Sequence, residues 1–454
     1  MAERGYALTL LGTPGKISIV LNENPYDALF IHLALVLCRP LKTFLAHVRD
    51  LLTPNGTLFI CGELVSLNDP KGKIDDCHVK EVIAALYENG FVINTHEEAS
   101  QPMENSPKSS SVRFHMIFGR KSDLFLRPYR KGDENTILPV FREVFKAQRS
   151  MAHWHWKFRD NPYGAYKIAQ AVSENGDLAG HYSGYPVPFY ASSGNGNSFL
   201  SFQIGDIMTL PGFRRLGLGK TSVLGRITEY FHYKFCVDHI PFLYGFVGGS
   251  HRKFGERFLG YQYMSEIPFH VLELKQAMSM PVVTWIKNKL YGVRVEEIHD
   301  IGSEFNDLFK RAAGNYGMLV KRDAQYMKWR YGDCPDNVHR IFALKRFEKL
   351  MGWCVFRLRD SALIWGDALF QEQGERPVRM VLSHVLHAFQ GVQRIEAWFS
   401  KKPAWWTKVL RQLGFKAADE PNGLVAGVTI FDPSFSLGSV EAKLYYTMGD
   451  SDLF

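Results

Sequence analysis

The stretch IGDIMTLPGFRRLGLGKTSVLGRITEY, residues 204–230, passes from an apolar run through a basic, glycine-rich turn into a second apolar pattern. Pro211 cannot donate to a sheet ladder, so it marks the end of the strand predicted for Ile204–Leu210. Beyond the turn, apolar side chains recur at helical spacing, at Val223, Leu224, Ile227, Tyr230 and Phe231. The pattern predicts a strand, a glycine-rich turn and a helix in succession.

A glycine-rich turn that opens a helix is suited to bind an anion. The first N–H groups of a helix have no partner within it, and the positive end of the helix dipole adds to their attraction for negative charge. Gly217 and Gly219 would let the backbone approach a phosphate group closely, because neither has a Cβ. The sequence therefore predicts phosphate binding at this turn.

The turn also matches a known motif. Arg214, Gly217 and Gly219 fit the pattern Arg/Gln-x-x-Gly-x-Gly/Ala, and the stretch resembles the acyl-CoA loop of the GNAT superfamily of N-acyltransferases. The resemblance implies a mixed α/β (α+β) fold. It also implies that the CoA pyrophosphate is bound at Arg214, Arg215, Leu216, Gly217, Leu218, Gly219 and Lys220. A solvated helix cap is the alternative interpretation of so short a pattern.

Landmarks around this stretch occur twice in the chain. Three of them recur in the same order: WKFRDNP (156–162) as WRYGDCP (329–335), Asp206 of IGDIM as Asp367 of WGDAL, and Tyr261 of LGY as Phe415 of LGF. Several landmarks in one order indicate an internal repeat. We therefore expect two tandem GNAT-like mixed-sheet domains, at residues 123–275 and 293–440, joined by a connector at 276–292.

The second copy lacks the motif of the first. Its corresponding stretch, EQGERPVRMV (372–381), contains no Gly-x-Gly. Glu372 and Glu375 would repel a pyrophosphate, and Pro377 has no N–H to donate. We expect a degenerate, non-catalytic domain that stabilises the first and helps to complete its acceptor pocket. The chain then ends in an acidic tail at 441–454, for which a solvated end is the first expectation and a docked tail lining a cleft the alternative.

Residues 1–122 alternate between strand and helix patterns. These predict strands at 16–21, 26–37, 57–63 and 114–118, helices at 41–52 and 77–88, and a turn at 53–56. The run RPLKTFLAHVRDLLTPNGTLFICGE (39–63), with Asp27 before it, resembles the C-terminal half of a class I S-adenosylmethionine-dependent methyltransferase. The glycine-rich loop and ribose-binding acid of that family have no counterpart here. We expect a truncated, Rossmann-like, non-catalytic remnant that binds no S-adenosylmethionine and provides a contact for a homo-oligomer or a pathway partner.

The composition indicates which kinds of partner and which cellular compartment to expect. The 454 residues carry a formal net charge of +8 without a block of lysines and arginines, so nucleic acid is not an expected partner. The six cysteines show neither a Cys-x-x-Cys pair nor a zinc spacing, and no apolar run has the length of a membrane span. We expect a cytoplasmic protein with no metal site and no membrane partner.

Acyl transfer to an amine needs a neutral amine, a donor for the thioester oxyanion and a proton for the leaving thiolate. The GNAT resemblance implies that a backbone N–H near the end of the strand, at Met208 or Thr209, serves the oxyanion. It also implies that Asp206 acts as the base. Because Asp206 recurs as Asp367 in the second copy, a structural role as a cap or a bridge between strands is the alternative.

The general acid departs from the family pattern. The usual tyrosine, four residues before the Gly-aromatic step, falls on Glu256 in this sequence. Glu256 and Tyr261 are therefore the candidates, with Tyr263 or unaided departure of the thiolate as alternatives. Glu229 and His232, on the helix after the loop, are predicted to be solvated.

These features predict an acyl-CoA-dependent N-acyltransferase that moves an acetyl or short acyl group from acetyl-CoA or another acyl-CoA to the primary amine of a small molecule. Proteins with similar tandem landmarks suggest an amino sugar or nucleotide-linked amino sugar as the acceptor, and an amino acid or peptide amine as the second choice. The missing tyrosine and the degenerate second copy favour the alternative, a non-catalytic acyl-CoA-binding or adaptor protein in a biosynthetic pathway.

Overall fold

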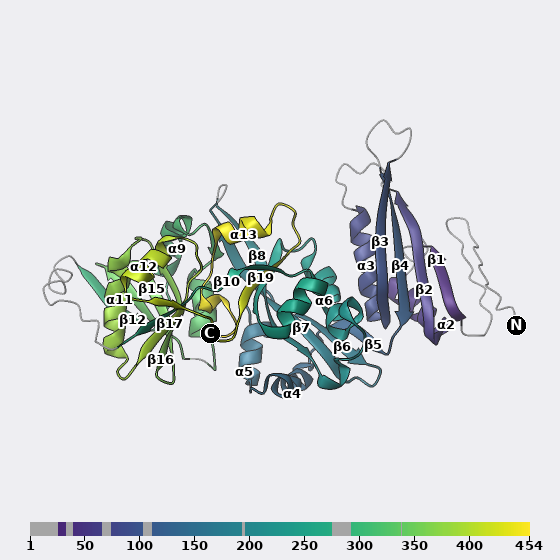
Figure 1. Ribbon diagram of the computed structural model, residues 1–454, viewed down its shortest axis with the longest axis horizontal. Helices are drawn as coiled ribbons and strands as arrows, with labels where there is room; N and C mark the ends of the chain where they lie inside the picture. The colour runs from purple at the N-terminus through teal and green to yellow at the C-terminus, as the bar shows by residue number, and fades with distance from the viewer. Residues whose placement is uncertain are drawn as a thin grey trace. The chain divides into compact units, whose positions relative to one another are not determined.

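The computed structural model describes residues 26–32, 40–65, 74–102, 111–192, 196–274, 292–336 and 338–454. The chain divides into two compact units, which we describe separately. The first comprises Met1–Pro128, Ala169–His181 and Thr209–Lys234, and the second comprises Tyr129–Ile168, Tyr182–Met208 and Phe235–Phe454. Figure 1 shows their elements in chain order from purple to yellow. The domain boundaries expected from the sequence follow the repeat instead, and they stay a prediction.

The first unit begins with a four-stranded sheet in the order β1-β2-β4-β3. β1 and β2 are parallel, whereas β4 is antiparallel to both of its neighbours. Two helices bury apolar side chains such as Leu45 and Leu86, and α3 runs beside β3 (Figure 1). The elements are β1 (Tyr26–His32), α2 (Leu41–Leu51), β2 (Leu52–Val65), α3 (Ile74–Glu88), β3 (Phe91–Pro102) and β4 (Ser111–Lys121).

Most of the patterns in this region are confirmed. Both helices and the strands predicted after residue 41 are present within a few residues, and β3, for which no pattern was identified, is the addition. The turn predicted at 53–56 is an irregularity inside β2, where these four residues of β2 lie opposite one residue of β1, Asp27. The strand predicted at 16–21 and the last five residues of the one predicted at 26–37 lie outside the described residues.

Three further segments complete the first unit. β5 pairs in antiparallel fashion with β6, β7 begins in this unit, and the glycine-rich loop leads into α6, which packs against α3. Tyr230 of α6 donates to Glu88 of α3 at 2.8 Å. The helix that follows the loop is thereby fixed to the N-terminal sheet and its helices. The bounds are β5 (Leu124–Pro128), β6 (Lys167–Ser173) and α6 (Val223–Phe231).

The second unit contains two mixed sheets. One runs β10-β19-β9-β8-β7-β13-β20 and the other β12-β14-β15-β16-β17-β11-β18. β8–β9 and β16–β17, the equivalent pairs of the two repeats, are parallel. The strands are β7 (Leu178–Ala191), β8 (Asn197–Thr209), β9 (Phe242–Val247), β10 (Gln262–Glu266), β11 (Phe269–Glu273), β12 (Val293–Ile298), β13 (Met318–Val320), β14 (Arg340–Arg346), β15 (Lys349–Arg359), β16 (Ala362–Phe370), β17 (Arg394–Trp398), β18 (Lys416–Ala418), β19 (Val425–Ile430) and β20 (Leu444–Tyr445).

Mostly short helices accompany these sheets. α5, α7 and α10 each continue into a π-helical turn of five residues. Within the described part of the chain, no helix is both long and apolar enough to cross a membrane. The helices are α4 (Glu134–Phe145), α5 (Met151–Trp154), α7 (Gly249–Phe254), α9 (Glu304–Ala312), α10 (Ala324–Met327), α11 (Glu375–Ala388), α12 (Trp405–Gln412) and α13 (Leu437–Lys443).

Strands of each repeat pair in the sheet of the other, and β13 of the second repeat also pairs with β7 in the first sheet. β11, which ends the first repeat, pairs with β17 and β18 in the sheet of the second repeat. β19, which ends the second repeat, pairs with β9 and β10 in the sheet of the first. Each sheet therefore needs a strand from the other repeat, and the two repeats interlock. The sequence patterns did not predict this exchange, because they assign strands in chain order.

Reciprocal contacts confirm the internal repeat. Trp156 Nε1 donates to the carbonyl oxygen of Trp329 at 2.6 Å, and Trp329 Nε1 donates to the carbonyl oxygen of Trp156 at 3.0 Å. The two rings stack with their centroids 5.4 Å apart. A contact in which each partner makes the same bond to the other is typical of two-fold symmetry. The repeats therefore face each other across an approximate two-fold axis at this tryptophan pair.

The C-terminal segment is docked, and the expectation of a solvated acidic tail is wrong. Asp450 and Phe454 are each 1% exposed. The buried guanidinium of Arg330 donates to the carbonyl oxygens of three tail residues, Gly449, Ser451 and Phe454, at 3.2, 2.7 and 2.8 Å. These bonds satisfy backbone groups that water would otherwise have to solvate. The acidic composition of the tail did not reveal them.

Candidate functional site

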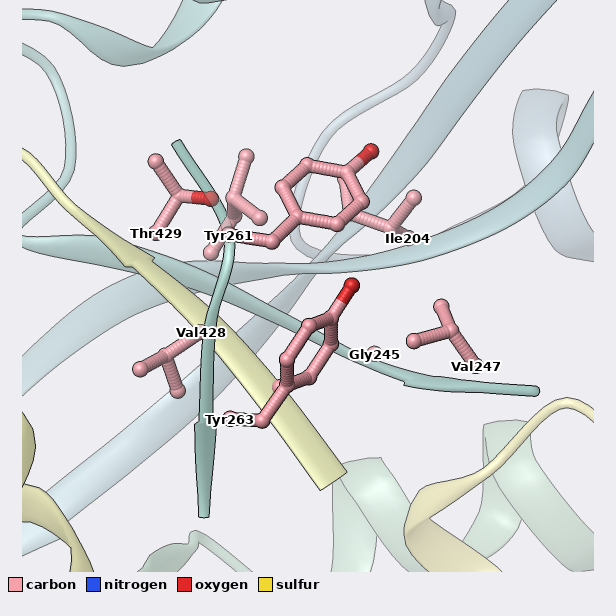
Figure 2. A pocket seen from close by; sticks show the side chains of 9 residues that line it. Ile204, Gly245, Val247, Tyr261, Tyr263, Val428 and Thr429 are labelled. Carbon is pink, nitrogen blue, oxygen red and sulfur yellow. The ribbon is translucent and has the colours of Figure 1, made fainter. Parts of the chain in front are cut away.

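β8 separates from β9 part-way along its length. The two strands pair only at Phe202–Leu243 and Gln203–Tyr244. Strands that part leave backbone N–H groups free of that ladder, and such groups can stabilise a developing oxyanion. The cleft at this point is lined by Ile204, Leu243, Gly245, Val247, Tyr261, Tyr263, Gly427, Val428 and Thr429 (Figure 2).

Two tyrosines lie next to each other in this cleft (Figure 2), with ring centroids 6.5 Å apart. Tyr261 is 7% exposed, and its hydroxyl oxygen is 2.7 Å from that of Tyr182. Tyr263 donates to the carbonyl oxygen of Arg252 at 2.7 Å. Burial, with the negative charge of Glu256, raises the pKa of Tyr263 to about 12. Tyr263 is therefore protonated at neutral pH, as a general acid must be, whereas Glu256 itself is exposed.

Asp206 lies just beyond the point where β8 leaves β9. Its φ is +53°, in the left-handed region that few residues other than glycine adopt. Its carboxylate is buried and pairs with two cations, Arg149 through Nη1 and Lys157 through Nζ at 3.2 Å. A carboxylate held in this way anchors the strand, which favours the structural alternative. Its role as a base stays a prediction.

The second repeat reproduces this anchor. Arg322 precedes Trp329 by the same interval as Arg149 precedes Trp156. Arg322 Nε lies 3.0 Å from each carboxylate oxygen of Asp367, the counterpart of Asp206. The repeated aspartates were identified from the sequence, but their arginine partners were missed. The matching interval before each tryptophan was the signal that could have found them.

Met208 and Thr209, predicted to offer an N–H to the oxyanion, are the last residues of β8. The side chain of Met208 is buried. The carbonyl oxygen of Thr209 accepts a hydrogen bond from Arg214 Nε at 3.0 Å. Arg214, the first residue of the motif, therefore ties the loop to the end of its own strand.

The glycine-rich loop belongs to the first unit and has the backbone that the motif predicts. Gly217 and Gly219 have φ of +75° and +54°, conformations that favour glycine. A Cβ on Gly217 would lie 2.2 Å from the carbonyl oxygen of Thr221. The helix predicted beyond the turn is α6, which begins at Val223, and its N-cap Ser222 accepts from the N–H of Gly225 at 3.1 Å. The amides of residues 214–220 therefore precede this helix.

Some backbone N–H groups of the loop form hydrogen bonds within the loop itself. The N–H of Leu216 donates to Phe213, and that of Leu218 donates to the hydroxyl of Thr221, each at 3.2 Å. Among the hydrogen bonds of the described residues, none starts from the N–H of Gly217, Gly219 or Lys220. The side chains of Arg214, Arg215 and Lys220 are exposed. The predicted pyrophosphate-binding residues thus combine spare N–H groups with exposed cations.

The environment of two side chains on and after α6 differs from the prediction. Glu229 and His232 are partly buried, not solvated. Burial lowers the pKa of His232 to about 3 and raises that of Glu229, which accepts a hydrogen bond from Tyr87. The prediction is wrong because α6 packs against α3, a helix assigned from the sequence to a separate N-terminal domain.

The second repeat has aromatic side chains where the first has its cleft. β16 and β17 pair as far as Trp365–Ala397. The ring of Trp365 contacts those of Phe399 and Trp406, with centroids 4.7 and 5.8 Å apart, and Phe399 stacks on Trp406 at 4.4 Å. Trp365 and Trp406 are completely buried. A packed stack has thus replaced the lining of a cleft.

The fold is similar to solved structures of GCN5-related N-acetyltransferases. A protein of unknown function from Enterococcus faecalis V583, described as a probable N-acyltransferase, has a TM-score of 0.51 at 11% identity, over 70% of this chain and 75% of that one. A GCN5-related N-acetyltransferase from Anabaena variabilis has a TM-score of 0.50 at 12% identity, over 68% of this chain and 73% of that one. No protein-family model and no curated protein matches the sequence. The likeness confirms the predicted GNAT-like mixed α/β fold. At these identities it concerns the fold alone and not the substrate.

Proposed function

We propose that the protein is an acyl-CoA-dependent N-acyltransferase that moves an acetyl or short acyl group to the primary amine of a small molecule. The separation of β8 from β9 beyond Gln203, in a fold similar to GNAT structures, carries the proposal. It opens a cleft in which a thioester carbonyl can meet strand N–H groups. The spare N–H groups of Gly217, Gly219 and Lys220 are suited to the pyrophosphate of CoA.

In the proposed reaction, acetyl-CoA or another acyl-CoA is the co-substrate. The amine attacks the thioester carbon, and the N–H of Met208 or Thr209 stabilises the oxyanion. The C–S bond then breaks, and a phenol of the cleft, Tyr261 or Tyr263, or the carboxyl group of Glu256 protonates the thiolate. Asp206 takes the amine proton in this scheme only if it is released from its two cations.

The acceptor, the partners and the compartment belong to the proposal. We infer a small primary amine, an amino sugar or nucleotide-linked amino sugar first, and a cytoplasmic setting without nucleic acid or membrane. Neither of the two structures compared above is described as a methyltransferase. The resemblance of residues 39–63 to methyltransferases is therefore a sequence-level hypothesis, and we assign residues 1–122 a contact with a second copy or a pathway partner.

A non-catalytic acyl-CoA-binding protein is the second candidate. Two observations favour it. The hydroxyl of Tyr261 is engaged by that of Tyr182, and the position of the usual tyrosine holds an exposed Glu256. In this case the cleft would hold a thioester without the means to protonate its leaving group.

Two measurements on the full chain separate the candidates. Calorimetric titration with acetyl-CoA tests binding, and release of free thiol with glucosamine, lysine or spermidine tests turnover. Binding with amine-dependent release supports the N-acyltransferase. Binding without release supports the second candidate, and no binding of acetyl-CoA contradicts both.

A further inference from the structure

One strand of the cleft comes from the second repeat. Thr429 of β19 lies opposite Leu243 of β9, and two positions earlier Gly427 lies opposite Gly245. Residues directly opposite each other in an antiparallel pair face the same side of the sheet, as do residues two apart on one strand. Thr429 therefore lines the cleft of the first repeat together with Ile204 (Figure 2).

The hydroxyl group of Thr429 differs from the other two that line the cleft. The hydroxyl of Tyr261 lies 2.7 Å from that of Tyr182, and the hydroxyl of Tyr263 donates to the carbonyl oxygen of Arg252 at 2.7 Å. Thr429 is 7% exposed, and its Oγ1 has no hydrogen-bond partner in the part of the chain that the structure describes. A buried hydroxyl without a partner is costly, and a polar group of a bound molecule would satisfy it.

The second repeat has an apolar residue at the equivalent position. The repeated aspartates align Phe202 with Leu363, each four residues before its aspartate. From these two residues the strand registers lead across β9 to Thr429 and across β17 to Leu272 of β11. Leu272, the counterpart of Thr429, is buried. The copy that holds the aromatic stack thus has an apolar side chain here, whereas the copy that has the cleft keeps a hydroxyl.

The enclosed part of the cleft is small and uncharged. Its volume is about 20 Å³, which holds one group of the size of water, such as an amine nitrogen with its hydrogen atoms. Of the nine described residues that line it, none carries a charged side chain, and Tyr263 stays neutral because its pKa is about 12. An ammonium ion would lose its hydration here without gaining a counter-charge, so the cavity favours an uncharged amine.

The titratable groups beside the cleft do not change this balance. Arg252 and Glu256 are exposed, and their opposite charges both act on Tyr263. Burial lowers the pKa of His251, which favours its neutral imidazole. The carboxylate of Asp206 is already paired with two cations. These described groups therefore give an ammonium ion no buried counter-charge.

We propose that Thr429 binds the amine of the acceptor by accepting one of its N–H groups, and that the acceptor is an amine of low basicity that enters the cleft uncharged. The inference rests on the proposed function and narrows its acceptor class. Peptide α-amines, with an ordinary pKa of about 7.7–8.0, belong to this class, whereas a lysine ε-amine, at about 10.4, does not. Amino sugars belong to it as well, because the oxygen atoms near their amine withdraw electrons.

The binding mode suits the reaction. When one N–H is held by the Thr429 hydroxyl, the lone pair of the amine remains available to the thioester carbon. A neutral amine and a thioester together give an amide and a thiol. Because no ammonium ion enters, no base is needed to remove a proton before the attack.

The first test measures thiol release from acetyl-CoA with dialanine amide, a probe whose amine is an α-amine. Valine has the shape of threonine without the hydroxyl, so for Thr429→Val we expect the KM of dialanine amide to rise about five- to tenfold, as the loss of one hydrogen bond implies. The dissociation constant of acetyl-CoA should stay unchanged, and the melting temperature should not fall, because an unpartnered buried hydroxyl is removed. Thr429→Ser should recover most of the affinity. Ile430→Val, at the next residue of β19 and outside the cleft lining, is the matched control and should leave the KM unchanged.

The second test compares dialanine amide with Nα-acetyl-lysine amide, whose free amine is the ε-amine. At pH 7 the neutral fractions of the two amines differ by more than about 100-fold, so we expect kcat/KM to favour dialanine amide by at least about 100-fold. The preference should narrow as the pH rises to 9. If thiol is released but Thr429→Val keeps the wild-type KM, or if both amines are used equally at pH 7, the inference is overturned and the proposed function stands. Absence of thiol release with these amines and with glucosamine contradicts the proposed function, and the inference with it.

Discussion

The first and second repeats share an anchor and differ in what surrounds it. Each has a tryptophan that bonds to the other, an arginine paired with the repeated aspartate, and a glycine before that aspartate. In the first repeat, the strand beyond the anchor borders a cleft lined by Tyr261 and Tyr263. In the second, the same region holds a stack of Trp365, Phe399 and Trp406.

The difference indicates how a duplicated fold can keep one site and lose the other. The anchor fixes the backbone of both copies, so the second can lose its loop and still fold. Its aspartate is bonded to three side chains: Asp367 accepts from Arg322, from Tyr331 at 2.7 Å and from Thr447 at 3.0 Å, and it is fully buried. Asp206 shares Lys157 with Asp452 of the tail, whose side chain is 24% exposed. We infer that the second copy serves stability and the first serves binding.

The largest expected effect is the loss of the second anchor. Asp367→Asn removes one of the two carboxylates that neutralise the fully buried guanidinium of Arg322, and it weakens the bonds from Tyr331 and Thr447 as well. Removing one partner of a buried pair costs about 3–5 kcal/mol. Asp206→Asn should cost about 1–2 kcal/mol, because Lys157 retains Asp452 and Arg149 is partly exposed. Urea unfolding followed by circular dichroism measures both. Equal losses would contradict the division of roles between the copies.

The next effect concerns the loop that only the first repeat has. Gly217→Asp places a side chain against the carbonyl oxygen of Thr221 and a negative charge among the spare N–H groups. We expect the affinity for acetyl-CoA to fall at least about 100-fold, or about 2.7 kcal/mol, and the melting temperature to fall as well, because Gly217 has φ of +75° and the new Cβ meets backbone atoms. Gly212→Ala is the control, since a Cβ there would meet nothing within 4 Å. Tight binding of acetyl-CoA by Gly217→Asp would refute the loop as its site.

The tail should make stability depend on pH. Burial, with the charge of Asp367, raises the pKa of Asp450 to about 6 from an ordinary value of 3.8, although Arg322 opposes the shift. The folded state thus holds this proton more tightly than the unfolded state, so the free energy of unfolding falls as pH rises from about 4 to 6. We expect this group to contribute about 2 kcal/mol over that window. Urea unfolding of wild type and Asp450→Asn at pH 4, 5, 6 and 7 isolates the contribution, which the variant should lack.

The sequence predicted what local patterns determine and missed what distant contacts determine. The helix predicted at 41–52 is α2 (Leu41–Leu51), and the strand predicted to end before Pro211 is β8, which ends at Thr209. The exchange of β11 and β19 was missed, because apolar alternation does not say which sheet a strand joins. The docked tail was missed because Arg330, which binds it, lies more than 100 residues earlier in the chain. The candidate site depends on both kinds of information, since its loop is local, whereas Tyr182 and Tyr261, which meet at their hydroxyl groups, lie 79 residues apart in the sequence.

The smallest expected effect tests what closed the second repeat. Glu375 pairs with Arg379 one turn later on α11, both partly exposed, so Glu375→Gln should cost at most about 0.5 kcal/mol. If the acidic charge alone excluded a pyrophosphate, the substitution would create a second site for acetyl-CoA. We expect no second site, because the ring of Phe454 lies against Gly366 and the aromatic stack occupies the place of the cleft. A calorimetric titration measures how many molecules of acetyl-CoA bind per chain. A stoichiometry near two would mean that charge, and not packing, prevents the second copy from binding acetyl-CoA.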